Sequence, residues 1–135
     1  MSAATTLPAS QPIDRVARLL AWVVPAGILT QAVLAGQGWF VDQGLIGLHG
    51  GIGHGVLTLA ILVAGWAWWR RPSWSVVVLT TAGVLGLIAQ TGLGYTGRRG
   101  GVALASSLHV PLGTLLLASS LVVAVLISQQ ARSGQ

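Results

Sequence analysis

Four long apolar segments follow one another along the chain, and none of them contains a charged residue. They cover residues 19–41, 43–69, 72–97 and 100–131. About 20 mostly apolar residues are enough for a helix to cross a hydrocarbon layer about 30 Å thick. Because lipid offers the backbone no hydrogen bonds, such segments predict helices. We expect four transmembrane helices, over residues 16–37, 45–69, 74–96 and 102–128.

The composition is that of a membrane protein. Only 7% of the 135 residues are charged and 53% are hydrophobic, whereas soluble domains carry about 25% charged residues. The sequence therefore predicts an all-α fold, a polytopic membrane four-helix bundle in a single domain over residues 15–131. Residues 1–14 are mostly small and polar, and they lack the basic start of a signal peptide. We expect them to form a flexible cytoplasmic tail.

The arginines predict the orientation of the bundle. Arg98 and Arg99 lie at one end of the expected helices, and the other five arginines lie at the opposite end: Arg15, Arg18, Arg70, Arg71 and Arg132. The positive-inside rule then places both termini in the cytoplasm, and five of the six tryptophans mark the same interface. The net charge of +5 forms no continuous basic face, so we expect no nucleic-acid partner.

An internal repeat relates the two halves of the chain. The matched positions, at an offset of 59 or 60 residues, are Gln31 and Gln90, Leu34 and Leu93, Gly38 and Gly97, His49 and His109, and Gly53 and Gly113. Each half is thus expected to be one helical hairpin whose second helix opens with His-x-x-x-Gly. We predict two tandem hairpins related by a pseudo-two-fold axis along the membrane normal, an arrangement known for parallel repeats.

The two repeated histidines are candidate cofactor ligands. Histidine inside a membrane helix is rare and usually functional, and the pseudo-axis sets His49 opposite His109 in the extracytoplasmic half. Zinc sites usually take three or four protein ligands, yet no carboxylate or thiol lies within a turn of either histidine. Haem needs only axial ligands, because the porphyrin fills four iron positions. We therefore predict one haem b with His49 and His109 as its axial iron ligands.

The residue content also restricts the type of haem. The chain has no cysteine, so the attachment motif of a covalent c-type haem is excluded. Its only methionine is Met1, which excludes a His/Met-ligated iron. The haem is therefore expected to be held non-covalently.

Glycines and arginines near the histidines complete the expected haem site. Gly53 and Gly113 lie one turn deeper on the same helix faces as the histidines, where a missing side chain leaves room for the macrocycle. Simple helix packing is the alternative for each glycine. Arg98 and Arg99 are expected to pair with the haem propionates, with a solvated loop pair or a lipid-phosphate contact as the alternative.

Three further polar residues each have more than one interpretation. Gln31 and Gln90 are expected to hydrogen-bond each other across the bundle, and contact with a quinone is the alternative. His54 follows His49 by five residues and points about 140° away from it around the helix. It is therefore a weaker candidate for a ligand than the repeated pair. Its other interpretations are a hydrogen-bond donor to a ligand residue and a packed imidazole.

Two tandem hairpins with His-x-x-x-Gly opening the second and fourth helices resemble one four-helix half of haem A synthase. The resemblance covers residues 16–128 and extends to small uncharacterised four-helix membrane proteins of high-GC bacteria. It implies haem ligation by His49 and His109 in a bacterial inner (plasma) membrane. The family places a glutamate before the first histidine and an arginine after it, but here Leu45–Leu48 precede and Gly50 follows. The resemblance thus implies haem binding more than haem-modifying chemistry.

These observations predict a membrane b-type cytochrome subunit that passes electrons through one bis-histidine haem and has no substrate chemistry of its own. Its expected partners are the lipid bilayer and either other membrane subunits of a respiratory or photosynthetic complex or a second copy in a homodimer. Two alternatives stay open. One is a half-size haem-modifying enzyme related to haem A synthase. The other is a cofactor-free structural accessory subunit whose histidines only form hydrogen bonds.

Overall fold

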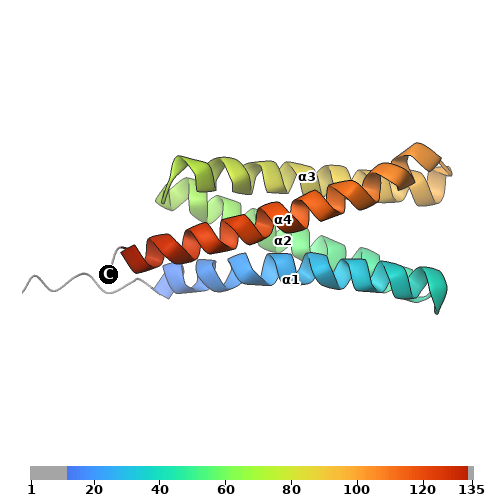
Figure 1. Ribbon diagram of the computed structural model, residues 1–135, viewed down its shortest axis with the longest axis horizontal. Helices are drawn as coiled ribbons and strands as arrows, with labels where there is room; N and C mark the ends of the chain where they lie inside the picture. Colours follow the sequence, from blue (N-terminus) through green and yellow to red (C-terminus); the bar gives the residue numbers. More distant parts are fainter. Residues whose placement is uncertain (1–11, 134–135) are drawn as a thin grey trace, which may run out of the picture.

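The computed structural model describes residues 12–133, which form four long helices joined by short links. The helices are α1 (Pro12–Phe40), α2 (Leu45–Arg70), α3 (Trp74–Gly100) and α4 (Ala103–Ser133) (Figure 1). No strand occurs among the described residues. The prediction of an all-α four-helix bundle is confirmed.

The helices are longer than the ranges expected from hydropathy. α3 continues to Gly100 and includes Arg98 and Arg99, which we expected in a loop. It ends where Gly101 adopts a left-handed conformation with φ 64°, a common way to stop a helix. The expected tail, residues 1–14, falls mostly outside the described residues, and its last three residues belong to α1.

All four helices are long and apolar enough to cross a membrane. Their outward faces are apolar too, with large side chains such as Leu19, Leu62, Leu85 and Leu115 more than half exposed. A soluble bundle places charged and polar residues on these faces. The exposed surface is thus of the kind that lipid can cover.

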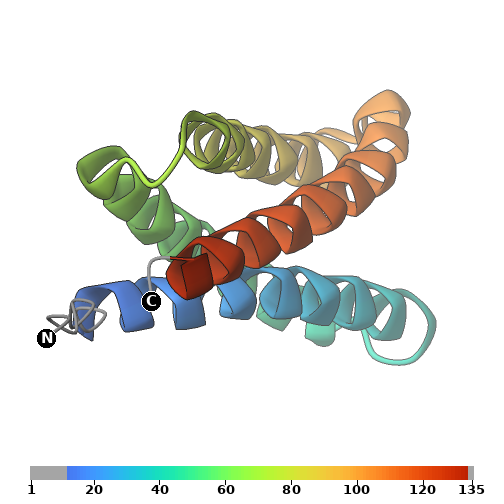
Figure 2. The ribbon, with the colours of Figure 1, turned by 60° about the vertical axis from the view of Figure 1, so that its left-hand side comes forward.

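The hairpins α1–α2 and α3–α4 diverge toward one end of the bundle. This end carries the 41–44 and 101–102 links and is called the loop end here; the opposite end carries Pro12, Ser133 and the 71–73 link and is called the terminal end (Figure 1). Toward the terminal end α1 approaches α4 and α2 approaches α3 (Figure 2). In the part of the chain that the structure describes, α2 and α4 nowhere come within 8 Å between Cα atoms. The helices α2 and α4 therefore lie diagonally opposite each other in the four-helix bundle.

The apolar core lies at the terminal end and in the middle of the bundle. One buried cluster near the terminal end includes Val63, Val76 and Ile127, and a second in the middle includes Val56 and Leu116. Toward the loop end, the only buried positions within residues 31–55 and 90–115 are Gly38 and Ala105. The close-packed core thus ends about two helix turns before the two repeated histidines.

Polar side chains hold the terminal end together. The Asp14 carboxylate on α1 accepts hydrogen bonds from Trp66 Nε1 and from the Arg70 guanidinium on α2, each over 3.1 Å. Trp22 Nε1 donates to Ser128 Oγ over 3.1 Å and so links α1 to α4. Tryptophan rings with an apolar body and a bonded N–H are typical of a membrane interface.

Glycines allow the helices of each hairpin to approach closely at the loop end. A Cβ atom at Gly97 would lie 3.0 Å from the backbone nitrogen of Ser106, and one at Gly38 would lie 3.2 Å from that of Ile46. Backbone atoms cannot rotate away as a side chain can, so a larger residue at either position would push the two helices slightly apart. The two contacts correspond to each other at the offsets of the sequence repeat.

Candidate functional site

The structure brings the two repeated histidines together. His49 is the fifth residue of α2 and His109 is the seventh of α4, and both side chains are partly buried. Their ring centroids lie 6.2 Å apart, and the ring planes make an angle of 56°. The two imidazoles therefore approach each other across the bundle, although the backbones of α2 and α4 do not.

Each imidazole is oriented by the backbone of its own hairpin. His49 Nδ1 lies 2.9 Å from the Gln31 carbonyl oxygen, and His109 Nδ1 lies 3.0 Å from that of Gln90. A carbonyl oxygen only accepts, so Nδ1 carries the hydrogen and donates in both rings. The neutral ring then keeps its lone pair on Nε2. Among the described residues, none donates to either Nε2.

The glutamines support the histidines instead of bonding each other, so that expectation is wrong. Gln90 Nε2 donates to the backbone oxygen of His109 over 2.9 Å, and Gln90 therefore contacts the same histidine at two points. Gln31 Nε2 and Gln90 Oε1 are buried without a hydrogen-bond partner. The repeat marked both glutamine positions, but the sequence did not indicate that they orient the histidines. The groups that accept from the histidine rings are backbone carbonyls, which every residue type carries.

Gly53 and Gly113 make room for these glutamines. A Cβ atom at Gly53 would lie 3.0 Å from Gln31 Oε1, and one at Gly113 would lie 2.9 Å from Gln90 Nε2. Each His-x-x-x-Gly segment thus contacts the preceding helix twice, at the imidazole and at the glycine one turn deeper. The missing side chain at each glycine leaves the amide end of the glutamine in its present place.

Gly94 is a further site residue that the sequence did not reveal. A Cβ atom at this position of α3 would lie 3.1 Å from Cε1 of the His109 ring. The imidazole therefore rests against the α3 backbone. The matching position in the first hairpin is Ala35, so the repeat gave no sign that glycine matters here.

The two glutamines are expected to differ in their effect on stability. Gln90→Leu removes the donor to the His109 carbonyl and should lower the free energy of unfolding by about 1 kcal/mol. Gln31→Leu removes an amide whose nitrogen is buried without a partner, so it should cost less or even stabilise the protein. Thermal unfolding in detergent, followed by tryptophan fluorescence, measures both variants. A larger loss for Gln31→Leu than for Gln90→Leu would contradict this assignment.

The remaining candidates lie on another face of the bundle. His54 Nδ1 donates to the Gly50 carbonyl of its own helix over 2.8 Å, and its ring lies 6.3 Å from that of Tyr95 on α3. The Arg99 guanidinium sits 4.8 Å from the centre of the same Tyr95 ring. Arg98 is exposed in the last turn of α3. His54 and Arg99 therefore belong to one cluster, separate from the histidine pair.

The histidine pair can contribute only two protein ligands to a metal. The described residues contain no group of three or more His, Cys, Asp or Glu side chains that could hold a metal ion. Both carboxylates of the chain are engaged elsewhere. Asp42 accepts from the Gly44 backbone N–H over 2.8 Å in the first link, and Asp14 is bonded at the terminal end. A metal bound by this pair takes its other ligands from outside these side chains, such as from a cofactor or water.

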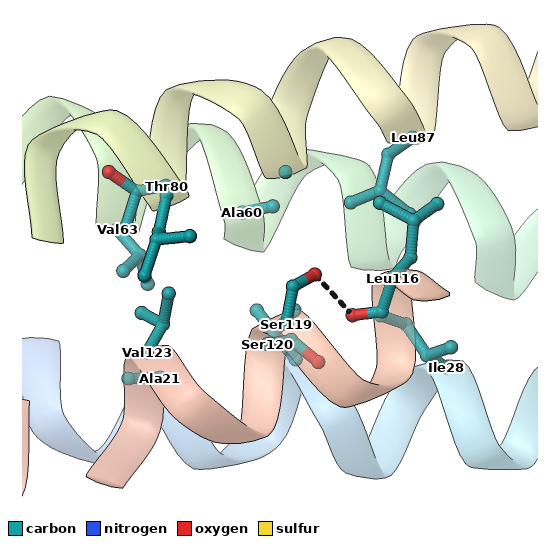
Figure 3. A pocket seen from close by; sticks show the side chains of 13 residues that line it. Ala21, Ile28, Ala60, Val63, Thr80, Leu87, Leu116, Ser119, Ser120 and Val123 are labelled. Atoms are coloured by element: carbon teal, nitrogen blue, oxygen red, sulfur yellow. Dashed lines mark hydrogen bonds between the residues drawn. The ribbon is translucent and has the colours of Figure 1, made fainter. Parts of the chain in front are cut away.

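A small cavity in the middle of the bundle offers no comparable chemistry. It has a volume of about 40 Å³ and lies among apolar side chains and the hydroxyls of Thr80, Ser119 and Ser120 (Figure 3). Each hydroxyl donates to a carbonyl of its own helix. The cavity thus has space for little more than one or two water molecules, and it is not a cofactor site.

No protein-family model matches the chain, and neither a curated protein nor a solved structure matches it. The likeness to half of haem A synthase therefore stays a prediction.

Proposed function

We propose that the chain is a membrane b-type cytochrome subunit in which His49 and His109 bind the iron of one haem. The observation that carries this proposal is the distance of 6.2 Å between the two ring centroids. Two imidazoles on opposite sides of one first-row metal ion, each bonded at about 2.0 Å, have ring centres roughly 6 Å apart. The angle of 56° between the planes fits as well, because each ring can rotate about its bond to the metal.

The hydrogen bonds at Nδ1 support the same conclusion. A metal-ligating histidine almost always donates its other ring N–H to a carbonyl, a carboxylate or water, which fixes the tautomer and the ring orientation. Both His49 and His109 do so through a backbone carbonyl. Two neutral imidazoles with lone pairs on Nε2 would repel each other if these faced a common gap, and a cation between them removes that repulsion.

The surroundings favour haem over a metal ion alone. Porphyrin supplies the four iron ligands that the chain lacks, and a bound haem provides a one-electron redox couple. The core of the bundle ends before the histidines, and the hairpins diverge there (Figure 2). Among the apolar side chains at this level, Leu48 and Leu108 are about half exposed and Val110 is 70% exposed. They are suited to contact a flat apolar ring, or lipid around it.

Equivalent contacts in the two hairpins support an internal repeat with pseudo-two-fold symmetry. His49 with Gln31 matches His109 with Gln90, and the contacts of Gly53 and Gly113 match in the same way. A pseudo-two-fold axis between α2 and α4 gives one iron two equivalent axial ligands. The two-fold symmetry of bis-histidine ligation then matches the pseudo-two-fold symmetry of the chain.

The proposed setting is the bacterial inner membrane, with both termini in the cytoplasm and the haem toward the extracytoplasmic side. The arginines and tryptophans at the terminal end support this orientation. Arg98, exposed at the loop end, is then available to a haem propionate, whereas the Arg99 guanidinium lies over the Tyr95 ring. Other membrane subunits of an electron-transfer complex, or a second copy of the chain, are the proposed partners.

Electron transfer fits the site better than the two alternatives. A haem-modifying enzyme needs an acid or base beside the haem. The two carboxylates of the chain both have structural partners, and His54 belongs to the separate cluster with Tyr95. A cofactor-free accessory subunit would leave both histidine Nε2 atoms without a partner inside the bundle. Two axial histidines fill the iron's coordination, which leaves electron transfer as the available reaction.

Haem content tests the proposal directly. Protein purified from membranes in detergent should contain one haem per chain, measured as its pyridine haemochrome, and acid acetone should extract all of it because the binding is non-covalent. A folded preparation without haem, or one with haem that resists extraction, would overturn the proposal. His54→Thr is the matched control, since it replaces a histidine of the same helix and should keep the full haem content.

A further inference from the structure

A second cluster of polar side chains lies on the outer face of α2 and α3. It consists of His54, Tyr95 and Arg99, which are all exposed. The imidazole lies 6.3 Å from the phenol ring between centroids, and the guanidinium lies 4.8 Å from the centre of that ring. On a bundle whose large exposed side chains are mostly apolar, this is a concentrated set of hydrogen-bonding groups.

The cluster offers both an acceptor and donors to a ligand. His54 Nδ1 donates to the Gly50 carbonyl, so the neutral ring keeps an acceptor at Nε2. Within residues 12–133, no side chain or backbone group hydrogen-bonds to His54 Nε2, to the Tyr95 hydroxyl or to the Arg99 guanidinium. His54 lies roughly 14 Å from the start of α2 along the helix axis. Polar groups at such a depth in a membrane are costly unless they have a partner.

The cluster breaks the symmetry of the two hairpins. The residues that correspond to His54, Tyr95 and Arg99 in the repeat are Thr114, Gly36 and Phe40. Helix packing and haem ligation recur in both halves, but this set of side chains occurs only once. A binding role for this one face would explain why the set has no counterpart in the other half of the repeat.

We propose that this face of α2 and α3 binds the head group of a lipid-soluble hydroquinone. A ligand that reaches an outer face of the bundle within the membrane must come from the lipid. Its hydroxyl can donate to His54 Nε2, while its oxygens accept from the Tyr95 hydroxyl and the Arg99 guanidinium. A phospholipid phosphate suits Arg99 and Tyr95 but itself presents only acceptors, so His54 would need its donor from another part of the head group, whereas a hydroquinone supplies donor and acceptors from one ring.

The inference rests on the proposed function, because it names the class of electron donor for the haem. His54 lies about 7.5 Å from His49 along α2, so the hydroquinone would be next to the haem site. Its oxidation to the quinone breaks two O–H bonds and releases two electrons in successive one-electron steps. His54 Nε2 would accept the first proton and water the second. A haem held by His49 and His109 would take one electron at a time and would have to pass each one on to the partner complex before the next step.

Binding of a hydroquinone analogue tests the site without relying on haem. The probe is 2-heptyl-4-hydroxyquinoline N-oxide, titrated into the purified full chain in detergent and followed by its own fluorescence. We expect saturable binding of one probe per chain. His54→Thr and Tyr95→Phe should each weaken binding about tenfold, the effect of losing one good hydrogen bond. Thr114→Val, at the matching position of the other hairpin, should leave the affinity unchanged.

Two results would overturn the inference. One is the absence of saturable binding to the wild-type chain, and the other is equal affinity in all four proteins. If phosphatidylglycerol displaces the probe and His54→Thr has no effect, the face binds a lipid phosphate instead. Haem content is measured on the same samples. Loss of haem with intact probe binding contradicts only the proposed function, and full haem with no probe binding contradicts only the inference.

Discussion

Replacement of either His49 or His109 by alanine is expected to lower the haem content at least tenfold. Each imidazole supplies one of the two axial bonds of the iron. A haem that is not attached through its porphyrin has no further bond to the chain. Any haem that remains should have an open axial position and bind carbon monoxide, which the wild-type protein should not do. Haem per chain and the carbon monoxide difference spectrum measure both effects. His54→Ala is the control and should behave like the wild type.

The pair of substitutions also tests the assignment of each ligand. If both variants keep the wild-type spectrum, the histidines are not ligands and the proposed site is wrong. If only one variant loses haem, the iron has a single ligand from this pair. Circular dichroism of each variant confirms that the helices remain folded, so that haem loss reports on ligation.

Gly97→Ala is expected to destabilise the second hairpin by about 1–3 kcal/mol, as overpacking does. The added Cβ would lie 3.0 Å from the Ser106 backbone nitrogen and 3.2 Å from its Cα atom. Because both atoms belong to the backbone, α3 and α4 must move apart at the loop end. Thermal unfolding in detergent, followed by tryptophan fluorescence, measures the change.

Gly92→Ala provides the matched control on the same helix. A Cβ atom at Gly92 meets nothing within 4 Å, so this substitution should leave packing intact. Alanine is the better helix former by about 0.5–1 kcal/mol, and the variant should be as stable as the wild type or more so. Equal stability of Gly97→Ala and Gly92→Ala would show that the close approach of α3 and α4 is not as described.

The sequence predicted the number and order of the helices because each is a long run without charge. It did not predict their ends. Hydropathy falls at Arg98 and Arg99, but the backbone hydrogen bonds of α3 continue to Gly100. Arginine is a good helix former, and a side chain at the end of a helix can reach polar surroundings. Along the chain, the side chains therefore become polar at Arg98, before the helix itself ends at Gly100.

The approach of His49 to His109 followed from the repeat, but their hydrogen-bond partners did not. The Nδ1 atoms bind backbone carbonyls of α1 and α3, and every residue type carries such a carbonyl. Which carbonyl accepts from a histidine depends on how two helices cross. The spacing of residues along one helix does not define that crossing. The repeat likewise gave no reason to place His54 beside Tyr95, because Tyr95 has no counterpart in the first hairpin.

The reduced-minus-oxidised absorption spectrum of the purified wild-type chain tests the central claim most directly. Two axial histidines on one non-covalent haem predict a sharp α-band typical of a six-coordinate b-type cytochrome after reduction with dithionite. The same reduced sample should give an unchanged spectrum under carbon monoxide, because no axial position is open. A folded protein that shows no such band, or whose band shifts under carbon monoxide, would contradict ligation by His49 and His109.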